Sequence, residues 1–162
     1  MFERPIFGAQ ILTVAMQIAG RAEPIGPWLD FLNSRDKVTM AVRDARLVPL
    51  ITGAAPVERP QVFANRNLIS LIVLTDPGVR DSVNMMKNVV TAILHIGPVI
   101  CRGEIHIGVD TPLGVYFDDL TGNFFPMTNV SLHTLSPLPI PLPKQADLAM
   151  INRTMVQAYY AG

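Results

Sequence analysis

The chain of 162 residues has little charge and almost no cysteine. Charged residues make up 16% of the sequence, and 13 basic residues balance 13 acidic ones. Proteins that bind duplex DNA usually carry a basic face, so we expect no DNA binding. The single cysteine, Cys101, excludes an intrachain disulfide framework and predicts a small buried side chain. This usage fits a reducing compartment, and we expect a cytoplasmic protein.

The sequence also lacks a hydrophobic run long enough to cross a bilayer near its start. Residues 6–20 are largely apolar, but this stretch is too short for a membrane helix and is interrupted by Gln10 and Gln17. We therefore predict strand in this region and no membrane insertion.

Motifs for catalysis are missing as well. The sequence has no glycine-rich phosphate loop, no nucleophile elbow and no paired-cysteine motif. A metal site needs at least three converging ligands, and Glu104 and His106 share a strand face without an obvious third. We expect no catalytic residues, no metal, no cofactor and no enzymatic activity.

What the chain does have is hydrophobic residues, at 49% of the sequence. A core is therefore easy to build, and disorder is not expected. With so few charges, apolar surface stays exposed unless something covers it. This favours self-association or membership of a larger protein assembly.

Short β-type runs dominate the pattern. In "VICRGEIHI", residues 99–107, apolar side chains alternate with Arg102, Glu104 and His106, which is typical of a half-buried strand. The preceding run and the Gly97-Pro98 turn predict a hairpin in which His95 lies opposite a residue near Ile100. Many short strands without a long helical period indicate an all-β protein made of small barrels.

The chain also contains a degenerate tandem repeat. "FANRNLI" (63–69) returns as "MINRTMV" (150–156), so that Asn65 and Asn152 lie 87 positions apart. Upstream, "GPWLDFLN" (26–33) matches "GVYFDDLT" (114–121), and Asp44 matches Asn129. The shared order of these matches favours a duplication over chance similarity between two β-rich halves.

The repeat divides the chain into three parts. Residues 1–74 form the first barrel repeat, and residues 90–162 form the second, which contains a Pro-rich loop at 136–144. Residues 75–89 form a linker. Asp81 or Ser82 could cap a short helix over "VNMMKN" in this linker, and we expect no helix elsewhere.

These motifs resemble the Sm-like (Lsm) family of small β-barrels. The family's first motif combines a Gly, an aromatic-Asp pair, an Asn and a strand, which corresponds here to residues 26–45 and 114–130. Its second motif, an apolar residue followed by Arg-Gly, corresponds to "ANRNLI" and "INRTMV". Asn67 and Thr154 replace the motif's Gly. The resemblance implies two fused Sm-like or SH3-like barrels.

The resemblance also implies a set of contact residues. In Sm-like rings, the Asp and Asn of the first motif and the Arg of the second form a pocket for a single-stranded base. Carried over by position, the candidates for ligand or subunit contact are Asp30, Asn33, Arg66, Asp118, Asn123 and Arg153. A single-stranded RNA-binding protein is therefore the alternative to the leading hypothesis, a structural protein that assembles through its strand edges.

For the two arginines and for the Pro-rich stretch, the sequence allows a structural role as well as a functional one. Arg66 and Arg153 could cap exposed carbonyl groups or pair with Asp30 or Asp118 instead of meeting a ligand. The stretch "PLPIPLPK" could be a rigid loop between two strands or an arm that lies across a neighbouring subunit. The predicted arm residues are Pro137, Leu138, Pro139, Ile140, Pro141, Leu142 and Pro143.

Overall fold

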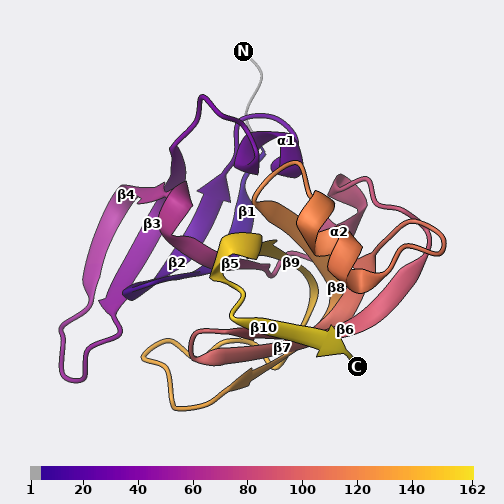
Figure 1. Ribbon diagram of the computed structural model, residues 1–162. Coiled ribbons are helices and arrows are strands. Elements are labelled where there is room, and N and C mark those ends of the chain that lie inside the picture. Colours follow the sequence, from indigo (N-terminus) through magenta and orange to yellow (C-terminus); the bar gives the residue numbers. More distant parts are fainter. Residues whose placement is uncertain (1–4) are drawn as a thin grey trace.

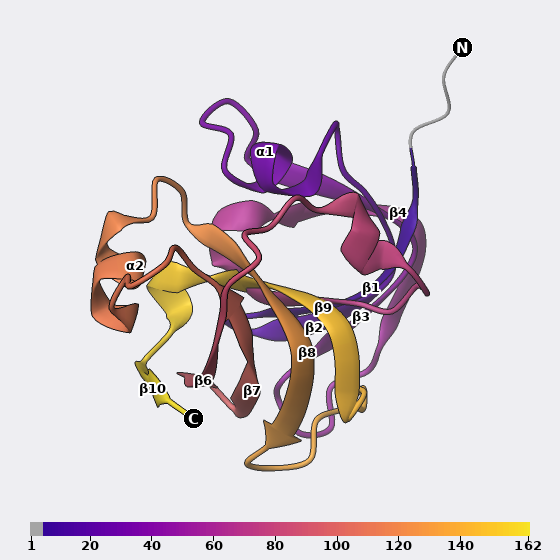
Figure 2. The same cartoon turned by 90° about the vertical axis from the view of Figure 1, so that its right-hand side faces the viewer.

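A computed structural model describes residues 5–162. In this part of the chain, ten strands form one antiparallel sheet in the order β10-β6-β7-β8-β9-β5-β1-β2-β3-β4. The sheet curves strongly, as Figures 1 and 2 show. The predicted all-β class is thereby confirmed.

The two halves have the same succession of elements (Figure 1). The first half contains β1 (Phe7–Thr13), β2 (Met16–Glu23), α1 (Trp28–Leu32), β3 (Thr39–Pro49), β4 (Val57–Asn65), the 3-10 turn η1 (Arg66–Leu68) and β5 (Ile69–Leu74). The second half contains β6 (Val89–Ile96), β7 (Val99–His106), α2 (Leu113–Asp119), β8 (Phe124–Thr134), β9 (Gln145–Asn152), η3 (Arg153–Met155) and β10 (Ala158–Ala161). In both halves the fifth strand pairs with the first, and the others follow in sequence order.

Helices α1 and α2 correct the prediction that helix occurs only in the linker. Each begins directly after a proline, Pro27 or Pro112, whose fixed φ suits the entry to a helix. With five and seven residues, these helices are too short to show a helical hydrophobic period. The helix starts match Pro27 of the first half with Pro112 of the second. The sequence repeat had instead matched Gly26 with Gly114, so the two alignments are out of step in this region.

The linker contains a helical turn, but this turn lies nearer the start of the linker than predicted. The 3-10 turn η2 covers Val79–Ser82 and follows Gly78, whose φ of 73° requires a residue that tolerates the left-handed region. The predicted helix over residues 83–88 is not present, because the chain is extended at Val83 and continues into β6.

The hairpin of β6 and β7 has the predicted geometry. His95 lies opposite Ile100, and Ile96 opposite Val99, which leaves Gly97 and Pro98 as a two-residue turn. Gly97 has a φ of 53°, as such a tight turn requires. Cys101 is buried, as predicted, whereas His106 is buried rather than exposed on the polar face.

A matching irregularity bends the sheet in each half. The pairing of β2 with β3 shifts around Gly20, and that of β7 with β8 shifts around Gly103. Opposite them, Asp44 and Asn129 both adopt a φ of 49°, a conformation that Asp and Asn tolerate better than most residues. These bulges increase the local twist and let the long strands β3 and β8 curl.

Two hydrophobic clusters fill the molecule, one for each half, but they exchange residues. Leu148 and Met150 from β9 belong to the cluster of the first half. Leu71 and Val73 from β5 belong to the cluster of the second half. The halves are therefore joined by shared packing as well as by backbone pairing.

Candidate functional site: the strand edges and the Asn-Arg turns

The two Asn-Arg segments form the same turn. In each, the Asn side-chain oxygen accepts a hydrogen bond from the backbone N–H two residues later, at 3.0 Å for Asn65 and 3.1 Å for Asn152. The turn then leads through η1 or η3 into the last strand of its half. Asn at these positions closes a local side-chain turn, which explains why a polar residue interrupts the apolar run.

The arginine of each segment stabilises the end of its own helix. The Arg66 guanidinium donates to Phe31 O at 3.1 Å, at the end of α1. The Arg153 guanidinium donates to Phe117 O at 2.9 Å and to Leu120 O at 3.1 Å, at the end of α2. Cations are favourable at the carboxyl end of a helix because they satisfy carbonyl groups that have no partner there.

Burial further limits what Arg66 can bind, whereas Arg153 is half-buried. Arg66 is only 8% exposed, and burial lowers the pKa of its guanidinium from the ordinary value. Among residues 5–162, the ion pairs join Arg21 to Asp44 and Arg43 to Glu23, so neither Asn-Arg segment uses a carboxylate. The geometry matches the interpretation in which these arginines cap carbonyl groups.

The structure brings only some of the predicted contact residues together. Asp30 and Asn33 line a hollow between α1, α2 and the linker, whereas Arg66 does not line it. Asp118 and Asn123 are exposed and lie outside this hollow. In the second half, Asn123 is bound through its backbone, since its carbonyl accepts from the Arg153 N–H.

Asn33 has a role that the sequence did not reveal. Its side chain accepts from Phe124 N–H at 2.8 Å and donates to Phe124 O at 3.1 Å, at the start of β8. This pair of bonds ties α1 of the first half to a strand of the second. Asn33 is therefore a contact between the halves within one chain.

The Pro-rich loop lies against its own chain. The Gln17 side chain donates to Ile140 O at 2.6 Å and accepts from Ile140 N–H at 2.9 Å. Leu138 and Leu142 pack against the cluster of the second half. The loop thus joins β8 to β9 and is fastened to β2 of the first half, which is the rigid-loop alternative.

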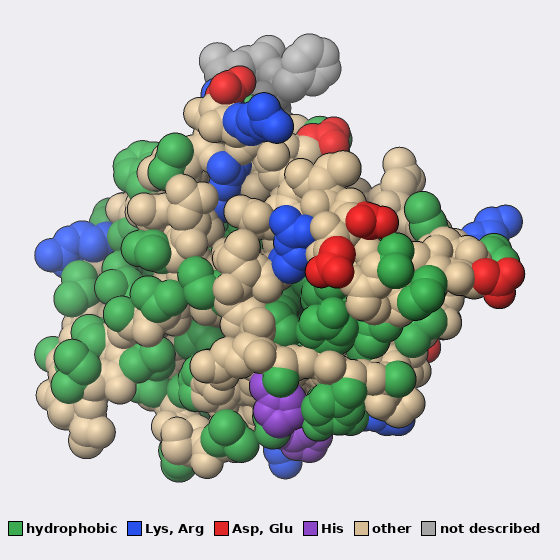
Figure 3. Space-filling view, in the orientation of Figure 1, with side chains coloured by type: hydrophobic (Ala, Val, Ile, Leu, Met, Phe, Trp, Pro, Cys, Tyr) green, Lys and Arg blue, Asp and Glu red, His purple; other side chains and the backbone are tan. Residues whose placement is uncertain are grey.

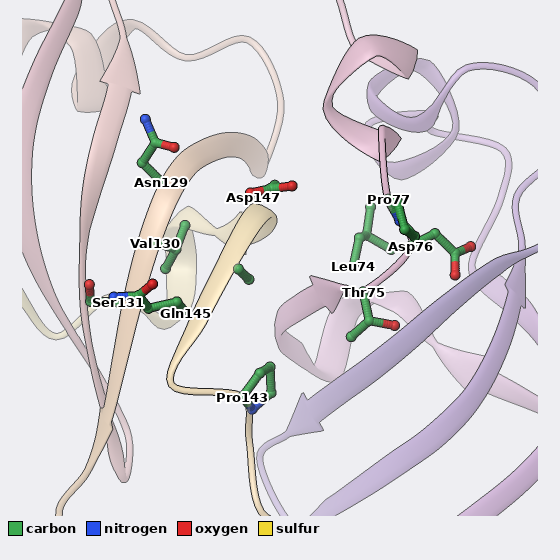
Figure 4. Close-up of a pocket in the computed structure, with 11 residues that line it drawn as sticks. Leu74, Thr75, Asp76, Pro77, Asn129, Val130, Ser131, Pro143, Gln145 and Asp147 are labelled. Carbon is green, nitrogen blue, oxygen red and sulfur yellow. The ribbon is translucent and has the colours of Figure 1, made fainter.

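A pocket lies beside this loop, where the two halves meet (Figure 4). One wall comes from β8 and β9, with Asn129, Ser131 and Asp147, and the other from the end of β5, with Thr75 and Asp76. The Asp76 carboxylate accepts from Gly8 N–H at 2.9 Å, so it is engaged in the fold. In the part of the chain that the structure describes, no group of three or more His, Cys, Asp and Glu residues could hold a metal ion.

The junction between the halves is a strand pairing. β5 and β9 lie antiparallel, with Leu71 opposite Ile151, Ile72 opposite Met150, Val73 opposite Ala149 and Leu74 opposite Leu148. The Asn152 side chain donates to Ile69 O at 2.8 Å across this junction and is 1% exposed. The pairing therefore combines a backbone ladder, a buried amide bond and side chains shared between two cores.

The counterparts of β9 and β5 in the other half have an unpaired edge at the two ends of the sheet. In the sheet formed by residues 5–162, β4 and β10 are the outermost strands, with one neighbour each. β4 is the first-half counterpart of β9, and β10 is the second-half counterpart of β5. Large apolar side chains stand exposed on them: Phe63 at 66%, Tyr159 at 36% and Tyr160 at 49%.

The surface around these edges is poor in charge. Figure 3 shows hydrophobic side chains gathered over β4 and around β10, with few charged groups among them. The last five residues of β4 and all of β10 are uncharged. Sequence patterns did not reveal these edges, because strand order depends on pairings between distant segments.

Among residues 5–162, no helix is long and apolar enough to cross a membrane. No protein-family model matches the chain, and neither the curated proteins nor the solved structures give a match.

Proposed function

We propose that the protein is a non-enzymatic assembly subunit in which each half is a small Sm-like or SH3-like barrel. Copies associate through their open strand edges, with themselves or within a larger protein assembly. The observation that carries this proposal is the exposed apolar edge at each end of a sheet whose equivalent strands are paired and buried at its centre. An unprotected edge is a template for pairing with another chain.

The mass in solution tests this proposal. Size-exclusion chromatography with light scattering is expected to give a multiple of the 17.7 kDa chain mass, and a monodisperse monomer would overturn the proposal. Phe63→Lys should lower the mass, because Phe63 is already 66% exposed and a charge on an edge opposes pairing. Val109→Lys is the matched control: Val109 is 74% exposed and lies in the loop before α2, so the mass should not change.

Single-stranded RNA binding by Asp30, Asn33, Arg66, Asp118, Asn123 and Arg153 is less favoured. The two guanidinium groups already donate to backbone carbonyls, and the chain has no net charge. An oligo(U) titration at low salt separates the two functions. Binding that Arg66→Ala and Arg153→Ala abolish without unfolding the protein would replace the assembly proposal with an RNA-binding one.

A further inference from the structure

We propose that β10 of one copy pairs with β4 of a second copy in the register of the internal β5·β9 junction. This inference rests on the proposed self-association and names the surfaces and the partner, which is a second copy of this chain joined head to tail. The β5·β9 junction supplies the register because each open strand has a counterpart there. Transferring it places Ala158 opposite Ala64, Tyr159 opposite Phe63, Tyr160 opposite Val62, and Ala161 opposite Gln61.

The equivalence of β10 and β5 follows from their shared neighbour pattern. Leu71 pairs with Leu12, which pairs with Gln17 in β2. Ala158 pairs with His95, which pairs with Ile100 in β7. Continuing along the strands, Ile72 corresponds to Tyr159. The separation is 87 positions, as between Asn65 and Asn152.

The backbone groups at the two edges are complementary in this register. Gly162 N–H donates to Thr91 O, so the alternation of an antiparallel ladder turns the N–H groups of Tyr159 and Ala161 outward. In β4, Arg66 N–H donates to Val38 O. By the same alternation, the N–H groups of Gln61 and Phe63 point outward, away from β3. Tyr159 then meets Phe63, and Ala161 meets Gln61, as hydrogen-bonded pairs.

The side chains show the same complementarity. At the internal junction, Met150 packs in the core of the first half and Val73 in that of the second, and both are 0% exposed. Their counterparts at the open edges are Phe63 and Tyr160, which are 66% and 49% exposed. Each would enter the core of the other copy, where the equivalent side chain is buried within one chain.

Asn65 completes the comparison. Asn152 donates across the internal junction to Ile69 O, and its counterpart Asn65 has the same local turn but is exposed. In the proposed contact, the Asn65 amide donates to Val156 O of the second copy. Glu58, Arg59 and Pro60 limit pairing to residues 61–65 of β4, because charge and proline oppose edge pairing.

Cysteine cross-linking tests the register. In Val62→Cys/Tyr160→Cys, the two cysteines form a directly opposed, non-hydrogen-bonded pair, whose Cα separation of about 4.5 Å permits a disulfide. Mild oxidation should give covalent multiples of 17.7 kDa on a non-reducing gel. Phe63→Cys/Tyr160→Cys places the cysteines on opposite faces and should not cross-link. Val62→Cys alone should not cross-link either, whereas a two-fold symmetric pairing of two β4 strands centred on Val62 would join two copies of it.

A single-atom change tests the contact through Asn65. Asn65→Asp keeps the oxygen that accepts from Asn67 N–H and removes the amide donor, so self-association should weaken about tenfold while the melting temperature of the monomer stays unchanged. Asn84→Asp adds the same charge at an exposed linker position and should leave association unchanged.

The outcomes separate this inference from the proposed function. A monomeric unmodified protein overturns both. An oligomer that neither cross-links at positions 62 and 160 nor responds to Asn65→Asp overturns the register and leaves self-association standing.

Discussion

Individual side chains hold the helices and turns of each half in place, and the arginines of the Asn-Arg segments are the main example. Each guanidinium donates to carbonyl groups at the end of a short helix that has few internal hydrogen bonds of its own. Phe31 O also accepts from Ser34 N–H at 3.3 Å, so Arg66 adds a second, charged donor to this carbonyl. Hydrogen bonds to a charged group are stronger than those between neutral groups, so their loss is costly.

Arg66→Ala should therefore destabilise the protein by about 1.5–3 kcal/mol, the range for a hydrogen bond to a charged group. The measurement is urea unfolding followed by circular dichroism. Arg46→Ala is the control, since Arg46 is exposed on β3 and its loss should change the free energy of unfolding by less than about 0.5 kcal/mol. Equal stability of the two variants would contradict the capping role of Arg66.

Cys101 should be unreactive in the folded protein. It is 0% exposed, and burial raises the pKa of its thiol from 9.0 to about 12. Because the folded state holds this proton more tightly than the unfolded state, the stabilisation is complete below pH 9 and is lost as the pH rises toward 12. Iodoacetamide at pH 8 should label Cys101 only in urea, and rapid labelling of native protein would contradict the buried position.

At the scale of elements, the bulges in β3 and β8 require glycine on the strands opposite them, β2 and β7, for steric reasons. A Cβ on Gly103 would lie 2.8 Å from the Met127 side chain and 2.9 Å from Thr128 O, and one on Gly20 would lie 2.7 Å from Arg43 O. The contacts with Thr128 O and Arg43 O cannot be relieved without moving backbone. Close approach of the strands thus explains these glycines, since neither has a positive φ.

Gly103→Ala should accordingly destabilise the fold by about 1–3 kcal/mol, as overpacked sites do. Gly114→Ala is a matched control with the opposite sign. A Cβ there would meet only the Tyr159 hydroxyl at 3.8 Å, and alanine is the better helix former, so α2 should gain up to about 1 kcal/mol. Thermal unfolding measures both changes, and a neutral Gly103→Ala would contradict the close strand approach.

For the whole molecule, the sheet is a continuous row of ten strands with an open edge at each end. Its central junction pairs β5 with β9, and the proposed contact between copies pairs their counterparts, β10 and β4. The pairing segments carry no charge: residues 61–65 and β10 contain only apolar, amide and hydroxyl side chains. Association through them depends on backbone bonds and apolar burial.

Self-association should thus be nearly independent of ionic strength between about 0.05 and 0.5 M NaCl, because salt screens charges and not apolar contacts. Sedimentation velocity at several protein concentrations measures the association constant at each salt level. RNA binding through arginines would weaken steeply over the same range, as counterions compete for the phosphates. A strong salt dependence of self-association would therefore contradict the edge contact.

Local patterns predicted the strands, the Gly97-Pro98 hairpin and the repeated Asn-Arg turns, because each depends on neighbouring residues alone. Helices α1 and α2 were missed because they are too short to show a period and contain aromatic residues that also suit strands. The bonds from Asn33 to Phe124 and from Gln17 to Ile140 span 91 and 123 positions, and no local pattern encodes them. The sequence marked Asn33 as a candidate for ligand or subunit contact, and left the Pro-rich loop open between a rigid loop and an arm. It could not reveal the partners of either within the chain, Phe124 and Gln17.

The pairing of β5 with β9 also has a consequence for synthesis on the ribosome. The last strand of the first half ends at Leu74, but the strand that covers its edge ends at Asn152. At about 5–20 residues per second, the β5 edge waits roughly 4–16 s for its partner. During that interval, β9 from a neighbouring nascent chain can take the place of the chain's own β9. Polysomes that bring nascent chains close together therefore give interlocked, strand-exchanged dimers a route to form beside correctly closed molecules.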